Sequence, residues 1–155
     1  LVFRLRDRLL ESFNIVHITG EGNCSRELEM KGYIQKEFLH QSFGDVLAAA
    51  SVVVSRAGAN SIYELLALRK PHLLVPLPKN ASRGDQLENA RKFCELGYSR
   101  YIEERLLTDD IFIREIKNLM ETKTAVEKRM ANFKAPDAIP MIVKEIKKIT
   151  DQTIV

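Results

Sequence analysis

Short apolar runs alternate with amphipathic helical patterns along this sequence, and this alternation constrains the fold more than any other feature. Most of the apolar runs are followed by a turn and then by residues with helical spacing, whereas residues 22–32, after the first run, form a turn with at most a short helix. The expected strands cover residues 14–20, 33–39, 51–55, 72–76 and 98–103, and the expected helices cover 1–13, 42–50, 61–69, 86–97, 108–121, 124–133 and 137–149. Short strands that are apolar on both faces and separated by helices are typical of a parallel sheet covered on both sides. The sequence therefore predicts an α/β fold with a three-layer, Rossmann-like open parallel sheet and helices on both faces.

Length and composition limit the class of protein. A chain of 155 residues fits a single domain, and a hydrophobic content of 45% is enough to form a core. The net charge of +3 is mild, so nucleic acid is not an expected partner. Cys24 and Cys94 lack metal-ligand spacing and are interpreted as free thiols in a reducing compartment. No apolar run in the sequence approaches the ~18 residues of a membrane-spanning helix.

One strand-to-helix corner lies in the segment "VVVSRAGANSIYELLALRK" at residues 52–70. An apolar strand ends at Ser55, a loop with Gly58 follows, and an amphipathic helix starts at once. Ligands of parallel α/β sheets bind at such corners, at the carboxyl ends of the strands. Glycine allows close approach of the backbone, and the start of a helix offers unpaired N–H groups and a partial positive charge. The segment lacks the GxGxxG and GxxxxGKS/T patterns, so we expect a phosphate here without a dinucleotide fingerprint or a P-loop.

Two charged residues of this corner each allow two interpretations. Glu64 follows Ser61 at the spacing of a capping box, in which the carboxylate binds a backbone N–H group. Alternatively, Glu64 accepts hydrogen bonds from ribose hydroxyls, and the pattern alone favours the cap. Arg56 is either a surface arginine paired with an acid or a charge beside a diphosphate, and the sequence favours neither.

A second polar segment, "PKNASRGDQLENA" at residues 78–90, follows the next strand and is expected beside the first corner. Its helix places Asp85 and Asn89 on one face, with Gln86 next to them. Such side chains suit sugar hydroxyls, but for Asp85 the pattern favours an N-cap. His17, at the end of an expected strand, is interpreted as a packing or hydrogen-bonding residue. The sequence has no nucleophile elbow, HExxH or DxD motif, and it carries no self-contained catalytic group.

Together these segments resemble a known family. The segments "SRAGANSIYELLALRKPHLLVPLP" and "ASRGDQLENARKFCELG", with "VHITGEGN" and "YIQKEFLHQSFGDVLAAAS" before them, are similar to the C-terminal, donor-binding domain of MurG-type UDP-N-acetylglucosamine transferases of the GT-B superfamily. The resemblance covers nearly the whole chain and is most specific in "RAGANSIYE" and "DQLENA". It implies a site for UDP-N-acetylglucosamine in this domain, and a site for a lipid-linked muramyl-pentapeptide acceptor in a second domain.

The resemblance also implies roles for individual residues. The residues expected near the diphosphate are Arg56, Gly58, Ala59, Asn60 and Ser61. Glu64 matches the acid that binds the ribose hydroxyls, which reverses the preference for a cap. The expected sugar-binding residues are Asp85, Gln86 and Asn89, and the expected uracil-side residues are Phe38 and Leu39. The family often has glutamine where this chain has Asp85, so the role of that residue is less well defined than the role of Gln86.

The family pattern begins with a strand and a glycine-rich loop, whereas this sequence begins within the helix that follows them, at "LVFRLRDRLL". We therefore expect residues 1–155 to form a single nucleotide-sugar-binding domain, a fragment of a two-domain GT-B enzyme that lacks one interior strand. The resemblance implies an inverting transferase of peptidoglycan synthesis that needs no metal or other cofactor. Its general base is expected in the other domain, so this chain is expected to contain no catalytic residue and to be inactive alone. The full-length protein is expected to be cytoplasmic and peripheral to the cytoplasmic membrane, at its inner face.

Two other functions are considered beside this one. One is a non-catalytic nucleotide-sugar-binding subunit that works with a separate membrane partner. The other is a GT-B-like UDP-N-acetylglucosamine epimerase, which would need acid and base side chains that the sequence does not place in this domain. An α/β domain whose polar loops only cap helices is the plainest alternative.

Overall fold

The computed structural model describes residues 1–134 and 138–152, and it describes only the backbone of residues 26, 151 and 152. The strands are β1 (Ile15–Ile18), β2 (Tyr33–Lys36), β3 (Val53–Ser55), β4 (His72–Leu74) and β5 (Ser99–Tyr101). The α-helices are α1 (Val2–Leu10), α2 (Phe43–Ala49), α3 (Ala59–Ala67), α4 (Lys79–Ser82), α5 (Asp85–Glu95), α6 (Asp109–Glu121), α7 (Lys123–Met130) and α8 (Ala138–Gln152). Two short 3-10 helices are η1 (Arg26–Leu28) and η2 (Glu104–Leu106).

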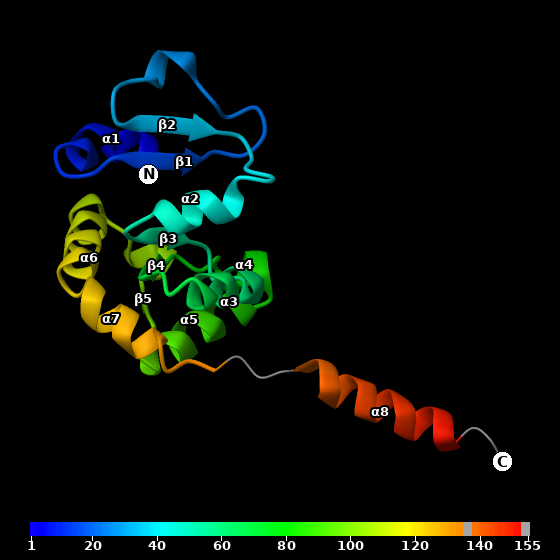
Figure 1. The fold of residues 1–155 in the computed structure, drawn as a ribbon. Helices are drawn as coiled ribbons and strands as arrows, with labels where there is room; N and C mark the ends of the chain where they lie inside the picture. Colours follow the sequence, from blue (N-terminus) through cyan, green and yellow to red (C-terminus); the bar gives the residue numbers. More distant parts are fainter. Residues whose placement is uncertain (135–137, 153–155) are drawn as a thin grey trace.

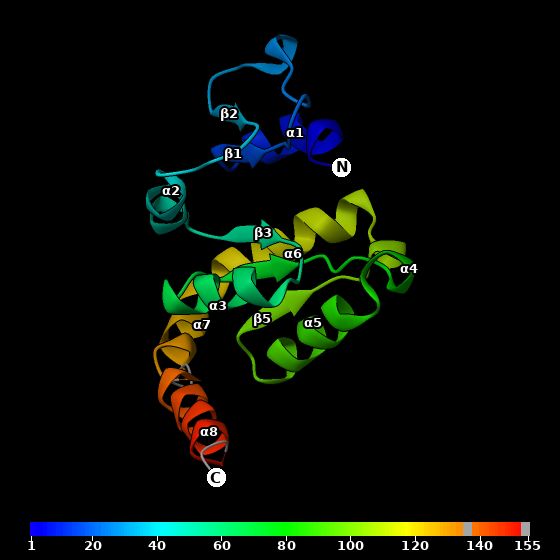
Figure 2. The ribbon, with the colours of Figure 1, turned by 90° about the vertical axis from the view of Figure 1, so that its right-hand side faces the viewer.

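Every pairing between the strands is parallel, as the alternation of strands and helices predicts. Strands β1 and β2 form one sheet, and β3, β4 and β5 form a second sheet in that order. Figures 1 and 2 show the two-stranded sheet with α1 at one end of the molecule and the three-stranded sheet among the other helices. The α/β fold is confirmed, with its strands divided between two sheets.

Two hydrophobic clusters lie on opposite faces of the three-stranded sheet, because successive strand residues point in opposite directions. Leu73 of β4 belongs to one cluster, which contains Leu5 and Leu9 of α1 and Phe112, Ile113, Ile116 and Leu119 of α6. Leu74 belongs to the other, which contains Ile62 and Leu66 of α3, Ala90 and Phe93 of α5 and Met130. The sheet is therefore the middle of three layers, with α6 on one side and α3 and α5 on the other (Figure 2).

Burial of the strands differs from the prediction of strands covered on both faces. Strand β4 is buried along its whole length. The outward residues of the other strands are half-exposed: Val16, Ile18, Ile34 and Val54. On β1 the ring of Phe3 from α1 packs against His17, at 4.9 Å between ring centroids, so α1 covers the face of His17 and leaves the face of Val16 and Ile18 open.

Three boundaries also differ from the sequence-based prediction. The helix expected at 61–69 begins two residues earlier, since α3 spans Ala59–Ala67. The segment expected to be a polar loop before α5 contains the single turn α4. The final helix was expected to start at residue 137, which lies outside the described residues, and α8 continues to Gln152.

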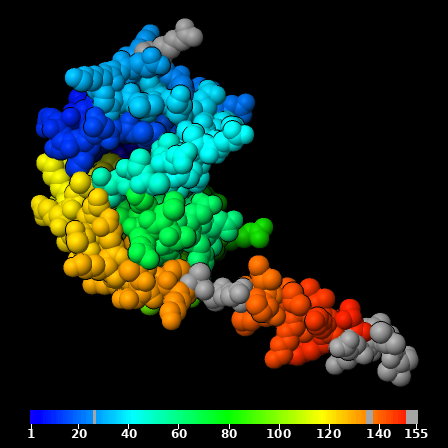
Figure 3. Space-filling model, viewed as in Figure 1, coloured from blue at the N-terminus to red at the C-terminus, as the bar shows by residue number. Residues whose placement is uncertain are grey.

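Helix α8 lies apart from the other described elements (Figures 1 and 3). Its predicted apolar stripe is present, and its members are 44–73% exposed: Ile139, Ile142, Val143, Ile146 and Ile149. These five residues therefore belong to neither of the two hydrophobic clusters.

A buried polar pair joins β4 to β5. His72 Nδ1 lies 2.7 Å from the Lys70 carbonyl oxygen, which can only accept, so this nitrogen carries the proton. His72 Nε2 then accepts from the hydroxyl of Ser99, at 2.6 Å. Burial lowers the pKa of the His72 imidazole, although the hydrogen bond to Lys70 opposes this effect. The native packing therefore requires the neutral ring.

This pair makes the stability of the protein depend on pH. Above about pH 6.5 the ring is neutral in both the folded and the unfolded chain and has no effect on the pH dependence. As the pH falls below about 6.5, the unfolded chain binds a proton that folded His72 resists, so the free energy of unfolding should fall by up to about 1.4 kcal/mol per pH unit. Urea unfolding between pH 7.5 and 5.5 measures this, with His17→Asn as a control that should retain most of the fall. A free energy of unfolding that does not change over this range would contradict the role of His72.

Candidate functional site

The corner between β3 and α3 has an open helix start. Gly58 is the N-cap of α3, and among the described residues no side chain accepts a hydrogen bond from the N–H groups of the first turn. These N–H groups have no partner within the helix, and the macrodipole adds a partial positive charge there. Gly58 has φ −66° and ψ 139°, which any residue can adopt, and an added Cβ would meet no atom within 4 Å. The space beside Gly58 is therefore open, and the start of α3 can receive an anion.

The capping box that the sequence pattern alone favoured for Ser61 and Glu64 does not form. Ser61 is the third residue of α3 rather than its N-cap, because the helix begins two residues before the pattern indicated. Glu64 is exposed, and no hydrogen bond or ion pair of its carboxylate occurs within the described part of the chain. It lies one helical turn beyond Asn60 and Ser61 on the same side of the helix. The carboxylate is thus available for a ligand next to the open helix start.

Arg56, the residue after β3, forms hydrogen bonds to two other segments, the loop after β4 and the short helix η2. Its Nη1 donates to the carbonyl oxygen of Val75, just after β4, at 3.1 Å, and to a carboxylate oxygen of Glu104 in η2, also at 3.1 Å. The guanidinium and the carboxylate are each nearly half exposed. Arg56 is therefore paired with an acid, as one of its two interpretations predicts, and it remains within reach of the corner.

The second polar segment lies beside the first corner, as expected. Gln86 Oε1 accepts from the backbone N–H of Ala57 at 3.3 Å and from that of Leu77 at 3.1 Å. Asn89 Nδ2 donates to the Ala57 carbonyl oxygen at 3.1 Å. Two of the three predicted sugar-binding side chains are thus in contact with the loop that leads into α3.

Asp85 is not the N-cap that the sequence pattern favoured. Gly84 holds that position, with φ 92°, because the left-handed turn between α4 and α5 suits glycine. Asp85 is the first residue of α5, and its carboxylate accepts from the N–H of Gln86 at 2.9 Å. It therefore pairs one N–H of the first turn, as a cap would, and remains exposed.

The two expected uracil-side residues lie after β2, in the other sheet. Phe38 is 52% exposed and stacks on His40, at 6.3 Å between ring centroids, and Leu39 is half-buried. No hydrogen bond joins either residue to the corner at Gly58 among the described residues. Their role at a nucleotide stays a prediction.

Sequence reasoning missed the acidic side of the corner. Glu104 pairs with Arg56, and the neighbouring Glu103 binds both Arg91 and Arg105. These arginines lower the pKa of the Glu103 carboxyl, the hydrogen bond from Arg105 having the largest effect. Two successive acids at the carboxyl end of an expected strand were the available signal, because they lie at the same edge of the sheet as Arg56.

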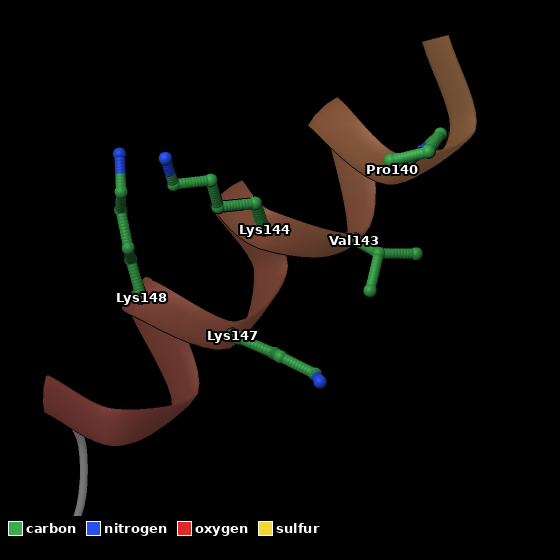
Figure 4. A pocket seen from close by; sticks show the side chains of 5 residues that line it. All are labelled: Pro140, Val143, Lys144, Lys147 and Lys148. Atoms are coloured by element: carbon green, nitrogen blue, oxygen red, sulfur yellow. The ribbon is translucent and has the colours of Figure 1, made fainter. Parts of the chain in front are cut away.

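Two hollows on the surface lie outside the corner itself. One of about 470 Å³, between α3 and α7, is bordered by Glu64 and by the aromatic rings of Tyr63 and Phe133. Another lies on α8, where three lysine side chains extend from the helix beside Pro140 and Val143 (Figure 4). Within residues 1–134 and 138–152, no group of three or more metal-ligating side chains is found. Over the same residues, no helix has the length and hydropathy needed to cross a bilayer.

Comparison with known proteins identifies relatives of nearly the whole chain. The transferase UDP-N-acetylglucosamine–N-acetylmuramyl-(pentapeptide) pyrophosphoryl-undecaprenol N-acetylglucosamine transferase of Clostridium tetani is 46% identical over 143 residues, 92% of this chain and 40% of the relative. The enzyme of the same name from Clostridium botulinum is 43% identical over 93% of this chain and 41% of its own length. The one from Legionella pneumophila is 40% identical over 91% of this chain and 39% of its length. The chain thus spans about two fifths of these relatives.

Solved structures and a family model agree with these relatives. The crystal structure of MurG from Acinetobacter baumannii matches 88% of this chain and 41% of that protein, with a TM-score of 0.72 and 19% identity. The glycosyltransferase of kitacinnamycin matches 75% of this chain, with a TM-score of 0.63. These two matches show the fold alone. The model of the glycosyltransferase family 28 C-terminal domain matches residues 2–146. The chain belongs to glycosyltransferase family 28 and comprises the C-terminal domain of that family.

Proposed function

We propose that this chain is the UDP-N-acetylglucosamine-binding domain of an inverting glycosyltransferase of peptidoglycan synthesis. The observation that carries the proposal is the uncapped start of α3 at the carboxyl end of β3, with Glu64 one turn away and its carboxylate without a partner among the described residues. Family 28 membership supports the reading of this corner as a nucleotide-sugar site. The names of the relatives support N-acetylglucosamine as the transferred sugar and a lipid-linked muramyl-pentapeptide as the acceptor.

The corner provides groups for each part of the donor. The N–H groups of Gly58, Ala59, Asn60 and Ser61 would bind the diphosphate, since they lie at or before the first turn of α3. Glu64 would accept hydrogen bonds from the ribose hydroxyls. Asp85, Gln86 and Asn89 would contact the sugar, and Phe38 and Leu39 would lie on the side of uracil. No cofactor is part of the proposal.

The chemistry of the proposed reaction explains why the corner is built for an anion. A hydroxyl oxygen of the acceptor forms a bond to the anomeric carbon of N-acetylglucosamine, on the side opposite the diphosphate, and the bond from that carbon to the diphosphate oxygen breaks. Negative charge then develops on the leaving UDP. The start of α3 and the guanidinium of Arg56 would stabilise that charge as it forms. The proton of the acceptor hydroxyl would go to a base outside this chain.

Acceptor binding and proton transfer would require a larger protein than this chain. Residues 1–155 would form one nucleotide-sugar-binding domain of a two-domain enzyme, and the acceptor site and the general base would lie in the other domain. The full-length protein would act at the inner face of the cytoplasmic membrane, where a lipid-linked acceptor is accessible. The isolated chain should therefore bind UDP-N-acetylglucosamine weakly and transfer no sugar.

A transfer assay tests this function. The full-length protein is incubated with radiolabelled UDP-N-acetylglucosamine and a lipid-linked muramyl-pentapeptide, and label in the lipid fraction is counted. We expect label to move to the lipid in the presence of both substrates. No transfer to this acceptor, together with release of free N-acetylmannosamine or its nucleotide, would instead support an epimerase.

Because the space beside Gly58 is open, adding one methyl group there should affect ligand binding more than stability. Gly58→Ala should leave stability within about 1 kcal/mol, because the backbone suits alanine and the small loss at the N-cap is offset by a less flexible unfolded chain. The same methyl group would occupy the approach of the diphosphate, so the Kd for UDP should rise about tenfold or more. Gly44→Ala is the matched control, since its Cβ also meets no atom but lies on α2. Equal Kd values for the Gly58→Ala variant and the wild type would exclude a ligand at this point.

A further inference from the structure

The backbone of Ala57 is held in an unusual way for a loop residue. Ala57 is completely buried and belongs to the cluster between the sheet and helices α3 and α5. A buried backbone N–H or carbonyl group needs a partner, because it has lost its hydrogen bonds to water. Both partners of Ala57 come from side chains of α5: Gln86 accepts from its N–H, and Asn89 donates to its carbonyl oxygen. The residue before Gly58 is therefore fixed by two amide side chains.

Gln86 also joins this loop to a second one. The same Oε1 atom accepts from the N–H of Leu77, in the segment between β4 and α4. Because two N–H donors converge on one atom, that atom must be the amide oxygen, and the orientation of the Gln86 amide is fixed. A single side chain thus sets the spacing of two adjacent strand-to-helix loops at the carboxyl edge of the sheet.

We propose that Gln86 and Asn89 are positioning residues, which hold the loops at Ala57 and Leu77 in the shape that receives the diphosphate. This inference rests on the proposed function, and it adds a role distinct from contact with the sugar. Ala57 is adjacent to Gly58, the N-cap of α3, so any shift of Ala57 moves the N–H groups that face the phosphate. A hydrogen bond weakens steeply when its N–H group moves out of line with the phosphate oxygen. Surrounding residues that hold the loop in place therefore maintain the affinity for the ligand.

Two variants separate this role from sugar contact. Gln86→Met keeps the length of the side chain but cannot accept from either N–H group, and Asn89→Ala removes only the bond to the Ala57 carbonyl. Glu88→Gln is the matched control on the same helix, since its exposed side chain contacts neither loop. The full-length protein and each variant are titrated with UDP and with UDP-N-acetylglucosamine. Hydrogen–deuterium exchange is measured for the peptides that contain Ala57 and Leu77.

For Gln86→Met we expect faster exchange in both peptides and a Kd for UDP that rises about tenfold, with at least the same factor for UDP-N-acetylglucosamine. For Asn89→Ala we expect faster exchange in the Ala57 peptide alone and a rise in Kd of about threefold to tenfold. A loss of affinity for UDP indicates a role in shaping the phosphate corner, because UDP has no sugar to contact. Should Gln86→Met not fold, Asn89→Ala decides through the same measurements.

Two results would overturn the inference. One is unchanged exchange in the Ala57 peptide of both variants. The other is a loss of affinity confined to UDP-N-acetylglucosamine, which would make Gln86 and Asn89 sugar contacts only. Failure of the proposed function is distinguishable from these, because it would appear as a wild-type protein that binds neither ligand. In that case faster exchange in the variants would still support the positioning of the two loops.

Discussion

Replacing Glu64 by alanine is expected to raise the Kd for UDP roughly 10- to 100-fold, since a charged hydrogen-bonding group contributes about 1.5–3 kcal/mol. The structure removes the competing explanation for this residue. Glu64 does not cap α3, and its carboxylate has no ion pair or hydrogen bond among the described residues. Its loss should therefore change the free energy of unfolding by no more than about 0.5 kcal/mol. Calorimetric titration with UDP, combined with urea unfolding, measures both quantities.

Two further variants make this prediction specific. Glu64→Gln keeps an acceptor oxygen and should recover part of the affinity, because a neutral amide can still accept from a ribose hydroxyl. Glu95→Ala removes an exposed carboxylate from the far end of α5 and should leave UDP binding unchanged. If Glu64→Ala binds UDP as tightly as the wild type but loses about 0.5–2 kcal/mol of stability, Glu64 has a structural role and not a role in binding.

Arg56→Met is expected to lower kcat for sugar transfer about 100-fold, because a charge that stabilises a leaving group in the transition state contributes about 10²–10³ to kcat. The ion pair with Glu104 is about half exposed, so its loss should cost less than about 1 kcal/mol of stability. Steady-state transfer by the full-length protein measures kcat, and thermal unfolding measures the stability of the same sample.

Arg91→Met is the matched control for Arg56. Arg91 pairs with Glu103 as Arg56 pairs with Glu104, and it is exposed to a similar degree, but it comes from α5 instead of the corner. Its replacement should leave kcat within about threefold of the wild type. Glu104→Gln, which removes the acid but keeps Arg56, should also retain most of the activity. Equal losses of kcat for Arg56→Met and Arg91→Met would show that the corner has no special need for Arg56.

The order of strands and helices could be predicted from the sequence because apolar spacing reports which residues are buried. Strand β4 and the amphipathic helix α6 follow their patterns closely. The start of α3 could not be placed in this way, because Ala59 and Asn60 have no apolar periodicity, and a Ser-x-x-Glu pattern competed with the true N-cap at Gly58. Because the pattern placed the start of α3 two residues too late, it favoured a capping role for Glu64 that the structure does not show.

The site was predictable in its residues but not in its contacts. Spacing on α5 placed Asp85, Gln86 and Asn89 near one another, and strand order placed them beside the first corner. The bonds of Gln86 to two different backbone N–H groups depend on how closely two loops approach, which no local pattern contains. The partnership of Arg56 with Glu104 joins residues 48 positions apart, and only the folded sheet brings their strand ends together.

The central claim is that the β3–α3 corner binds the diphosphate and ribose of UDP-N-acetylglucosamine. Calorimetric titration of the full-length wild-type protein and of the double variant Arg56→Met/Glu64→Ala with UDP-N-acetylglucosamine tests it most directly. The account predicts saturable binding of one ligand per wild-type chain, and binding by the double variant at least 100-fold weaker, while the double variant stays folded and its melting temperature falls by no more than about 10 °C. Absence of binding by the wild type, or equal affinity of the two proteins, would contradict it.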